Sequence, residues 1–118
     1  MINGQAVRNA LSLVERRWMS KNKTIQIDNG VDNSTSIVHV MFLYFPDELR
    51  RKGYGRQVLS EILEVVDSFG YEADIYPDAS FGTDITVLEN FYTSMGFMVT
   101  DGHIMKRAAR RSNVLLAA

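Results

Sequence analysis

The chain has 118 residues, of which 46% are hydrophobic and 23% charged, and this suits one soluble domain with a single modest core. It contains no cysteine, which excludes a disulfide framework, a thiolate metal site and a cysteine nucleophile. Arg8, Glu15, Arg16 and Arg17 interrupt the apolar pattern near the start, and no later apolar run is long enough to span a bilayer. We therefore expect a cytoplasmic protein that does not enter the membrane.

The charges are unevenly distributed along the chain. The formal net charge of -1 argues against a general nucleic-acid binder. Residues 57–105 contain no Lys or Arg but nine acidic residues: Glu61, Glu64, Asp67, Glu72, Asp74, Asp78, Asp84, Glu89 and Asp101. The basic residues form two groups: Arg50, Arg51, Lys52 and Arg56, then Lys106, Arg107, Arg110 and Arg111. The first basic group suits a polyanion, while the acidic set suits either a cationic ligand or ordinary solvated helix faces.

The first half of the chain predicts a helix followed by a hairpin. Residues 5–19 place their apolar side chains at helical spacing: Ala6, Val7, Ala10, Leu11, Val14 and Trp18. Residues 23–28 alternate as a strand does, residues 29–33 are rich in turn formers, and residues 36–45 form a β-branched and aromatic run. These patterns predict two antiparallel strands joined by a turn at 29–33.

The second half predicts two helices and three short strands. A helix over 54–69 should end at Gly70, and a strand over 71–76 should follow it. Thr86 and Glu89 have the spacing of a capping box, which predicts a helix from there through Met95 that ends at Gly96. Two further strands, 97–100 and 103–106, are predicted to close the sheet as a hairpin.

The loop Arg50-Arg51-Lys52-Gly53-Tyr54-Gly55-Arg56 lies between a predicted strand and a predicted helix. Its glycines allow close approach of the backbone, and a helix N-terminus presents unpaired N–H groups to an anion. Four basic side chains within seven residues add to the attraction for a phosphate. The sequence therefore predicts a phosphate-binding loop.

Two other phosphate-binding loops can be compared with this one. A P-loop is excluded because no Gly-Lys-Ser/Thr follows the glycines. A dinucleotide-binding loop would need a third glycine where Val58 stands, although Asp74 lies near the distance expected of a ribose-binding acid. The dinucleotide alternative stays open at this point.

The loop resembles the acyl-CoA pyrophosphate motif of the GNAT superfamily of N-acetyltransferases, Gln/Arg-x-x-Gly-x-Gly/Ala, here Arg50 to Gly55. A second segment, Asn90-Phe91-Tyr92-Thr93-Ser94-Met95-Gly96-Phe97, resembles the later helix-to-strand motif of that family. The order of the predicted elements agrees with the family from about Ile37 to Arg107, while residues before that are matched by element type alone.

The resemblance implies an α/β fold of the α+β type: a mixed, mostly antiparallel central sheet flanked by about three helices. It implies one acyltransferase domain over residues 1–118. Within it, residues 1–35 would form an N-terminal helix and hairpin arm, residues 36–107 the acyl-CoA-binding core, and residues 108–118 a peripheral tail.

The resemblance also implies where acetyl-CoA would bind as co-substrate, with no metal. The strand end Leu43, Tyr44 and Phe45 would separate from its neighbour and pair with the pantetheine arm. The diphosphate would be bound by the loop residues Arg50, Arg51, Lys52, Gly53, Tyr54, Gly55 and Arg56, with Lys52 and Arg56 also able to reach the other phosphate. Ordinary solvent-exposed charges are the alternative reading of Lys52 and Arg56.

The catalytic roles are implied in the same way. Tyr92 would protonate the departing thiolate, or would simply belong to the apolar core with its neighbours. His39 stands at the position, fourteen residues before Gly53, where some lysine-modifying members carry a catalytic Glu, and a histidine can accept a proton near neutral pH. His39 as an ordinary sheet residue is the alternative, and Asp78 and Asp84 are the other candidates for the base.

The predicted function is transfer of an acetyl group from acetyl-CoA to a primary amine, on a protein lysine or a small cationic molecule. The alternative is a catalytically silent acyl-CoA-binding module with a regulatory or protein-interaction role. No direct binding to nucleic acid is expected, and the exposed edges of a small mixed sheet are compatible with a homodimer.

Overall fold

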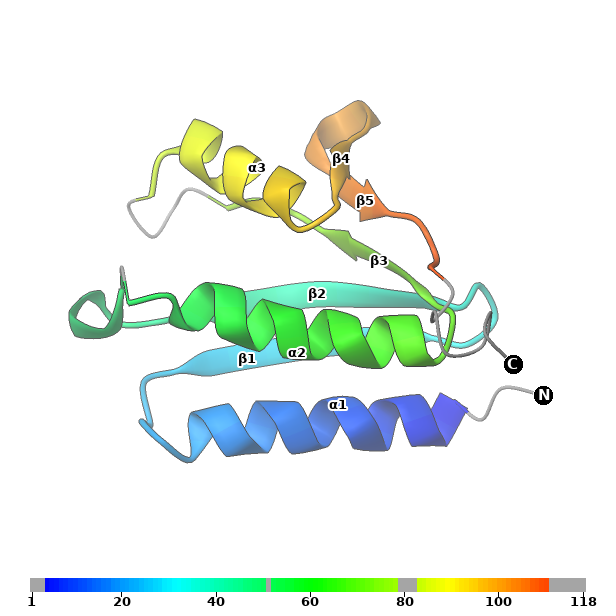
Figure 1. Ribbon diagram of the computed structural model, residues 1–118, viewed down its shortest axis with the longest axis horizontal. Helices are drawn as coiled ribbons and strands as arrows, with labels where there is room; N and C mark the ends of the chain where they lie inside the picture. Colours follow the sequence, from blue (N-terminus) through cyan, green and yellow to red (C-terminus); the bar gives the residue numbers. More distant parts are fainter. Residues whose placement is uncertain (1–3, 51, 79–82, 111–118) are drawn as a thin grey trace.

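The computed structural model describes residues 4–50, 52–78 and 83–110, which form a mixture of helices and strands (Figure 1). The helices and strands are α1 (Gly4–Met19), β1 (Gln26–Asp32), β2 (Ile37–Tyr44), α2 (Tyr54–Ser68), β3 (Glu72–Ile75), α3 (Ile85–Ser94), β4 (Met98–Val99) and β5 (Met105–Arg107). Short 3-10 turns occupy Asp47–Leu49 and Asp101–His103. Within the described residues, no helix is both long and apolar enough to cross a membrane.

The strands form one sheet in the order β1-β2-β3-β5-β4. The pair β2–β3 is parallel, and the pairs β1–β2, β3–β5 and β4–β5 are antiparallel. The parallel pair is joined through α2, as a parallel connection requires. The predicted mixed, mostly antiparallel sheet with three helices is therefore confirmed.

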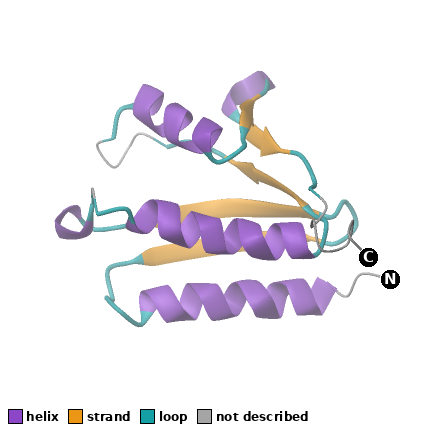
Figure 2. Cartoon of the chain, viewed as in Figure 1, coloured by secondary structure: helices purple, strands orange, loops and turns teal. Residues whose placement is uncertain are grey.

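The helices α1, α2 and α3 lie on the same face of the sheet (Figure 2). This face carries the buried strand residues Val38, Val40, Ala73, Ile75 and Met105, which alternate along their strands with residues facing the other way. One helix covers them with a fully apolar stripe, Val58, Leu59, Ile62, Leu63 and Val66 of α2. Among the described residues, no helix covers the opposite face, where Met41 and Met98 are exposed.

The predicted hairpin is confirmed, but the predicted turn at 29–33 is wrong, because β1 continues through Asp32. Asn29 is buried inside the strand, where its Nδ2 donates to Glu15 Oε2 of α1 over 2.8 Å. The turn comes later, and Asp32 Oδ1 accepts from the backbone N–H and the hydroxyl of Ser34 there, over 3.0 Å and 2.7 Å. A contact with α1 thus overrides the turn preference of Asn29.

The predicted ends of the helices are mostly confirmed. Gly70 follows α2 with a φ of 70°, and Gly96 follows α3 with a φ of 99°, a conformation that favours glycine. The predicted capping box at Thr86 is wrong, because Asp84 is the N-cap of α3 and its carboxylate accepts from the Thr86 N–H over 2.7 Å.

The strands β2 and β3 separate halfway along β2. Their pairing ends at Val40 opposite Ile75, whereas β2 continues to Tyr44. At the same place the register with β1 shifts: Asn29 faces Val40 and Asp28 faces Phe42, which leaves Met41 without a partner on β1. An extra residue of this kind bends and twists a strand, so the bulge accounts for the divergence of β2 from β3.

Candidate functional site

A cleft of about 940 Å³ occupies the space where β2 and β3 diverge. Its walls are the N-terminal end of α2 and one side of α3, with the ends of β2 and β3 between them. The sequence-predicted residues that line it are Leu43, Tyr44, Phe45, Arg50, Gly53, Tyr54, Gly55, Arg56 and Tyr92. Residues far apart in the sequence are thus brought together in one cleft.

The first turn of α2 presents its backbone N–H groups at one end of this cleft. Gly53 is the N-cap with a φ of 80°, and no described side chain caps the helix there. The first amides of a helix have no acceptor within the helix and carry a partial positive charge. A Cβ added at Gly53 or Gly55 would meet no atom within 4 Å, so a ligand has open access to the backbone at both glycines. The geometry suits a bound anion.

The basic side chains of the loop are placed differently from one another. Arg50 lines the cleft and also ties the loop to β2, since its Nε donates to the Phe45 carbonyl over 2.8 Å and its Nη1 is 3.0 Å from Asp47 Oδ1. Lys52 is exposed and is not part of the cleft wall. Arg51 lies outside the described residues.

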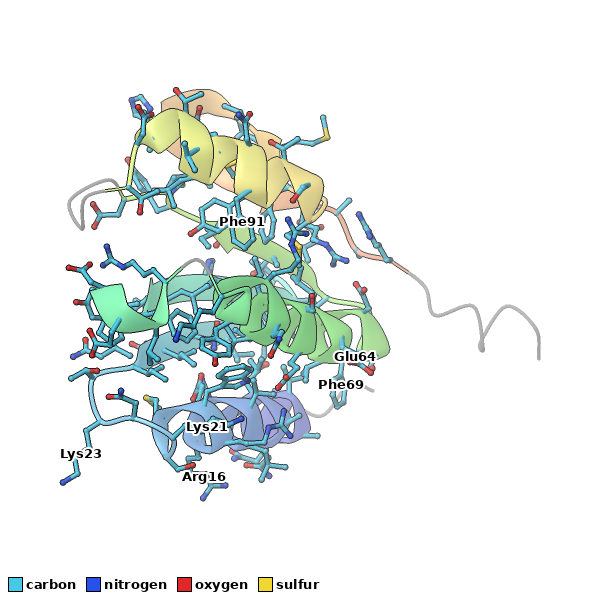
Figure 3. All side chains as sticks on the ribbon, turned by 60° about the vertical axis from the view of Figure 1, so that its left-hand side comes forward. Arg16, Lys21, Lys23, Glu64, Phe69 and Phe91 are labelled. Carbon is cyan, nitrogen blue, oxygen red and sulfur yellow. The ribbon has the colours of Figure 1, made fainter. Side chains whose placement is uncertain are left out.

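Arg56 extends from α2 towards the C-terminal end of α3. Its Nη2 donates to Ser94 Oγ over 3.2 Å, its Nη1 lies 3.2 Å from Met95 Sδ, and its guanidinium lies 5.3 Å from the centre of the Phe91 ring. Figure 3 shows Phe91 on the side of α3 that faces α2. Arg56 therefore spans the gap between the two helical walls of the cleft.

The end of β2 supplies aromatic side chains on both sides of the strand. Phe45 is buried against Trp18, with ring centres 6.1 Å apart, and against Tyr54 at 6.3 Å. Tyr44 lies 6.5 Å from Phe42 and 5.4 Å from the Arg50 guanidinium. Leu43 packs against the core. Beyond Val40 the strand no longer pairs with β3, and its residues Met41 to Tyr44 line the cleft.

Tyr92 is buried at the other side of the cleft, between Phe91 and Phe97. No hydrogen bond to its hydroxyl is found within the described residues, and the residue lines the cleft. Burial raises the pKa of Tyr92 to about 12, so the phenol keeps its proton throughout the neutral range. Tyr92 thus lines the cleft as a protonated donor, and no acceptor for its hydroxyl occurs in the part of the chain that the structure describes.

His39 lies beside the cleft and is not part of its wall. It faces Asp74 across the β2–β3 pairing, with 2.6 Å between His39 Nδ1 and Asp74 Oδ1. Asp74 lies within β3, and its side chain is on the sheet face opposite α2, where it contacts His39. A ribose-binding acid would instead have to face the ligand bound at the N-terminus of α2. The structure therefore does not support the dinucleotide alternative.

The two other candidate bases both lie at the cleft. Asp78 and Asp84 line it on the side of β3 and α3. The Asp84 carboxylate is occupied by the Thr86 N–H as the cap of α3. Among the described residues, no three His, Asp or Glu side chains gather closely enough to bind a metal ion.

Several residues that line the cleft were not predicted from the sequence. The outer end of the cleft includes exposed apolar side chains: Met41, Tyr76 and Val87. Met41 and Val87 belong to elements with ordinary alternation or helical spacing, and Tyr76 directly follows β3, so no local signal distinguishes these residues from core residues. The bulge at Met41 and the end of β3 at Ile75 bring Met41 and Tyr76 to the cleft, and the position of α3 brings Val87.

The structure is similar to solved acetyltransferase structures. No protein-family model and no curated protein matches the sequence. The PaiA N-acetyltransferase of Thermoplasma acidophilum, solved with coenzyme A, matches with 25% identity and a TM-score of 0.55. The match covers 70% of this chain and 51% of that one. Arabidopsis thaliana Naa50, solved with the bisubstrate analogue CoA-Ac-MVNAL, matches with 17% identity and a TM-score of 0.49, over 70% and 60% of the two chains. The present chain thus spans about half the length of the first of these proteins.

Proposed function

We propose that this chain, which has the fold of the GNAT N-acetyltransferases, transfers an acetyl group from acetyl-CoA to a primary amine. One observation supports the proposal above the others. One cleft at the divergence of β2 and β3 is lined both by the first turn of α2, which no described side chain caps, and by Tyr92, whose hydroxyl has no hydrogen-bond partner among the described residues. An anion site and a proton donor at one cleft are what a phosphate-bearing thioester needs.

Acetyl-CoA fits the residues along this cleft. The diphosphate would accept hydrogen bonds from the first-turn amides of α2, next to Gly53 and Gly55, with Arg56 adding positive charge. The amide groups of the pantetheine arm would pair with the backbone of β2 beyond Val40, where β3 no longer pairs with it. Bound acetyl-CoA would supply an activated thioester carbonyl to the reaction.

The reaction requires two proton transfers, one from the acceptor nitrogen to a base and one from an acid to the sulfur. The acceptor ammonium first releases one proton to solvent. Its neutral nitrogen then forms a bond to the carbonyl carbon, and the carbon–sulfur bond breaks. The nitrogen loses one proton to a base, for which we propose His39, acting directly or through water. The sulfur gains one proton, for which Tyr92 is the donor. Solvent returns the proton to Tyr92 and removes it from His39, so the products are an N-acetylated amine and coenzyme A.

The environment of Tyr92 limits how it would act. Its pKa of about 12 lies well above the value of about 8.5 that is typical of a free thiol. The phenol would therefore stabilise the departing sulfur mainly through a hydrogen bond, and the thiolate would take up the Tyr92 proton as solvent replaces that proton on the phenol oxygen. Such a donor is worth more inside a buried cleft than in water.

The acceptor we propose is cationic, either a protein lysine or a small amine. Three carboxylates line the cleft: Asp47 in the turn after β2, where it pairs with Arg50, Asp78 after β3, and Asp84 at the N-terminus of α3. Carboxylates at the mouth of a cleft attract a cation and raise its local concentration. The exposed apolar side chains of Met41 and Tyr76 beside them favour an acceptor that also has aliphatic or peptide groups.

Calorimetry with acetyl-CoA, coenzyme A and NADH tests the ligand class. We expect the first two to bind and NADH not to bind. A second measurement follows release of the coenzyme A thiol with a lysine-rich peptide and with spermidine as acceptors. Absence of acetyl-CoA binding would overturn the proposal, whereas binding without transfer to any amine would favour the silent acyl-CoA-binding module.

A further inference from the structure

A row of paired residues crosses the sheet, and its side chains lie on the helix-free face. Register places Gly30 of β1 opposite His39 of β2, His39 opposite Asp74 of β3, and Asp74 opposite Lys106 of β5. His39 has side-chain exposure of 42% and Asp74 of 18%, so the carboxylate is the more buried partner. The imidazole is therefore anchored at Asp74 and open towards solvent.

The contact with Asp74 determines which ring nitrogen carries the proton. An ionised carboxylate is an acceptor only, so the 2.6 Å contact requires His39 Nδ1 to be the donor. In the neutral ring, Nε2 then has the free lone pair. No partner for Nε2 occurs among the described residues, which leaves it available as a proton acceptor. Histidine bases in other enzymes are oriented in the same way by a carboxylate.

The pair lies one register step from the cleft. His39 and Asp74 are followed by Val40 and Ile75, the last residues of the β2–β3 pairing, and both of these line the cleft. Met41, two residues after His39, also lines the cleft, and both side chains approach Gly30 on the helix-free face. Two residues of strand span about 7 Å, which an imidazole and one water can bridge.

We propose that Asp74 is a positioning residue that keeps His39 Nε2 unprotonated and oriented, and that the acceptor amine approaches across the helix-free face of the sheet. This inference rests on the proposed acetyltransferase function. It assigns to Asp74 a role that is exerted through His39, the proposed base. As the carbon–nitrogen bond forms, the amine proton passes to Nε2, directly or through one water, and then to solvent. The Asp74 carboxylate stabilises the imidazolium through its contact with Nδ1.

A purely structural role for the pair would give different results. An ion pair at a partly exposed site contributes little to stability. Glu72 offers a matched control, because it is an exposed carboxylate on the same strand and the same face, opposite Ile37. Asp74→Ala and Glu72→Ala each remove one acid from this face, but only the first removes the partner of His39.

The ring state is measured first, by nitrogen NMR of the labelled full chain, with His103→Gln used to assign the two histidines. We expect the neutral His39 ring to carry its proton on Nδ1 in the parent protein and in Glu72→Ala. In Asp74→Ala we expect the Nε2-protonated form to become the major one. A parent ring protonated mainly on Nε2 would overturn the proposal, and this outcome does not depend on the choice of acceptor.

Turnover is measured next, as coenzyme A release with the lysine-rich peptide and with spermidine. We expect Asp74→Ala, His39→Ala and the double variant to lose a similar factor in kcat, about 100-fold, because the two residues act as one unit. Asp74→Glu should recover part of the lost kcat, while Glu72→Ala should have the same kcat as the parent protein. Acetyl-CoA affinity should be unchanged in all of them.

The outcomes separate the two proposals. If Asp74→Ala turns over as fast as the parent, or if the losses of the two single variants multiply in the double variant, Asp74 does not act through His39. The acetyltransferase proposal would survive that result. If the parent protein binds no acetyl-CoA in the same calorimetric series, the proposed function fails, and the positioning role fails with it.

Discussion

Arg107 on β5 donates two hydrogen bonds to the carboxylate of Asp67 on α2, over 2.7 Å and 3.0 Å. Its Nε donates a third to the Met95 carbonyl at the C-terminal end of α3, over 3.1 Å. The Arg107 side chain is 4% exposed. One buried guanidinium therefore fixes both helices that form the walls of the cleft to the same strand.

Arg107→Met should destabilise the fold by about 2 kcal/mol or more, because it leaves the Asp67 carboxylate and the Met95 carbonyl without their partner. Urea unfolding at neutral pH measures the loss. Lys106→Met is the control, since Lys106 is exposed on the opposite face of the same strand. Equal free energies of unfolding for the two variants would show that the Arg107 contacts contribute little.

Gly53→Glu and Gly70→Glu separate backbone strain from ligand binding. The two glycines have φ values of 80° and 70°, and neither has an atom within 4 Å of an added Cβ. Each variant should lose roughly 1 kcal/mol of stability from the strained backbone. Only Gly53→Glu should lose acetyl-CoA binding in calorimetry, because its carboxylate would lie beside the α2 amides. If Gly53→Glu still binds acetyl-CoA, the proposal that the diphosphate binds at this loop is wrong.

Tyr92→Phe should lower kcat about 100-fold and leave acetyl-CoA affinity unchanged, because it removes only the hydroxyl that would face the departing sulfur. The thiol-release assay measures it. Tyr71→Phe is the control, because the Tyr71 hydroxyl donates to Asn33 Oδ1 over 3.2 Å, at the hairpin turn. Unaltered turnover in Tyr92→Phe would make the assignment of the proton donor wrong.

Alkaline pH should destabilise the parent protein more than Tyr92→Phe. Burial raises the pKa of Tyr92 from 10.0 to about 12, so the stability that its neutral form contributes is complete below pH 10 and is lost between pH 10 and 12. At pH 11 the extra loss amounts to about 1.4 kcal/mol. Urea unfolding of both proteins at pH 8 and pH 11 gives the difference. The same loss in both proteins would mean that Tyr92 titrates normally.

Much of the fold could be predicted because its signals are local. The apolar spacing of α2 and the glycine at position 70 give that helix nearly its observed bounds, Tyr54–Ser68. The basic glycine loop likewise predicts an anion site at the N-terminus of α2. The end of β1 could not be predicted, because Asn29 is held in the strand by Glu15, fourteen residues earlier.

The cleft itself could be predicted only in part. The sequence allows Tyr92 to be either a proton donor or a core residue, and the structure shows it buried against Phe97 and at the same time lining the cleft. The sequence pattern treats Lys52 and Arg56 alike, whereas the structure places only Arg56 at the cleft. Which of several neighbouring charges faces a site depends on the path of the backbone in space.

The sequence by itself determined the order of helices and strands, the alternation that buries one face of the sheet, and the glycine loop that starts α2. These follow from hydrophobic periodicity and backbone freedom, which act over a few residues. Only the tertiary structure decided that β2 leaves β3 after Val40, and that Asp74 meets His39 across the sheet. Strand pairing joins residues 35 positions apart, and their meeting depends on register, which no local pattern specifies.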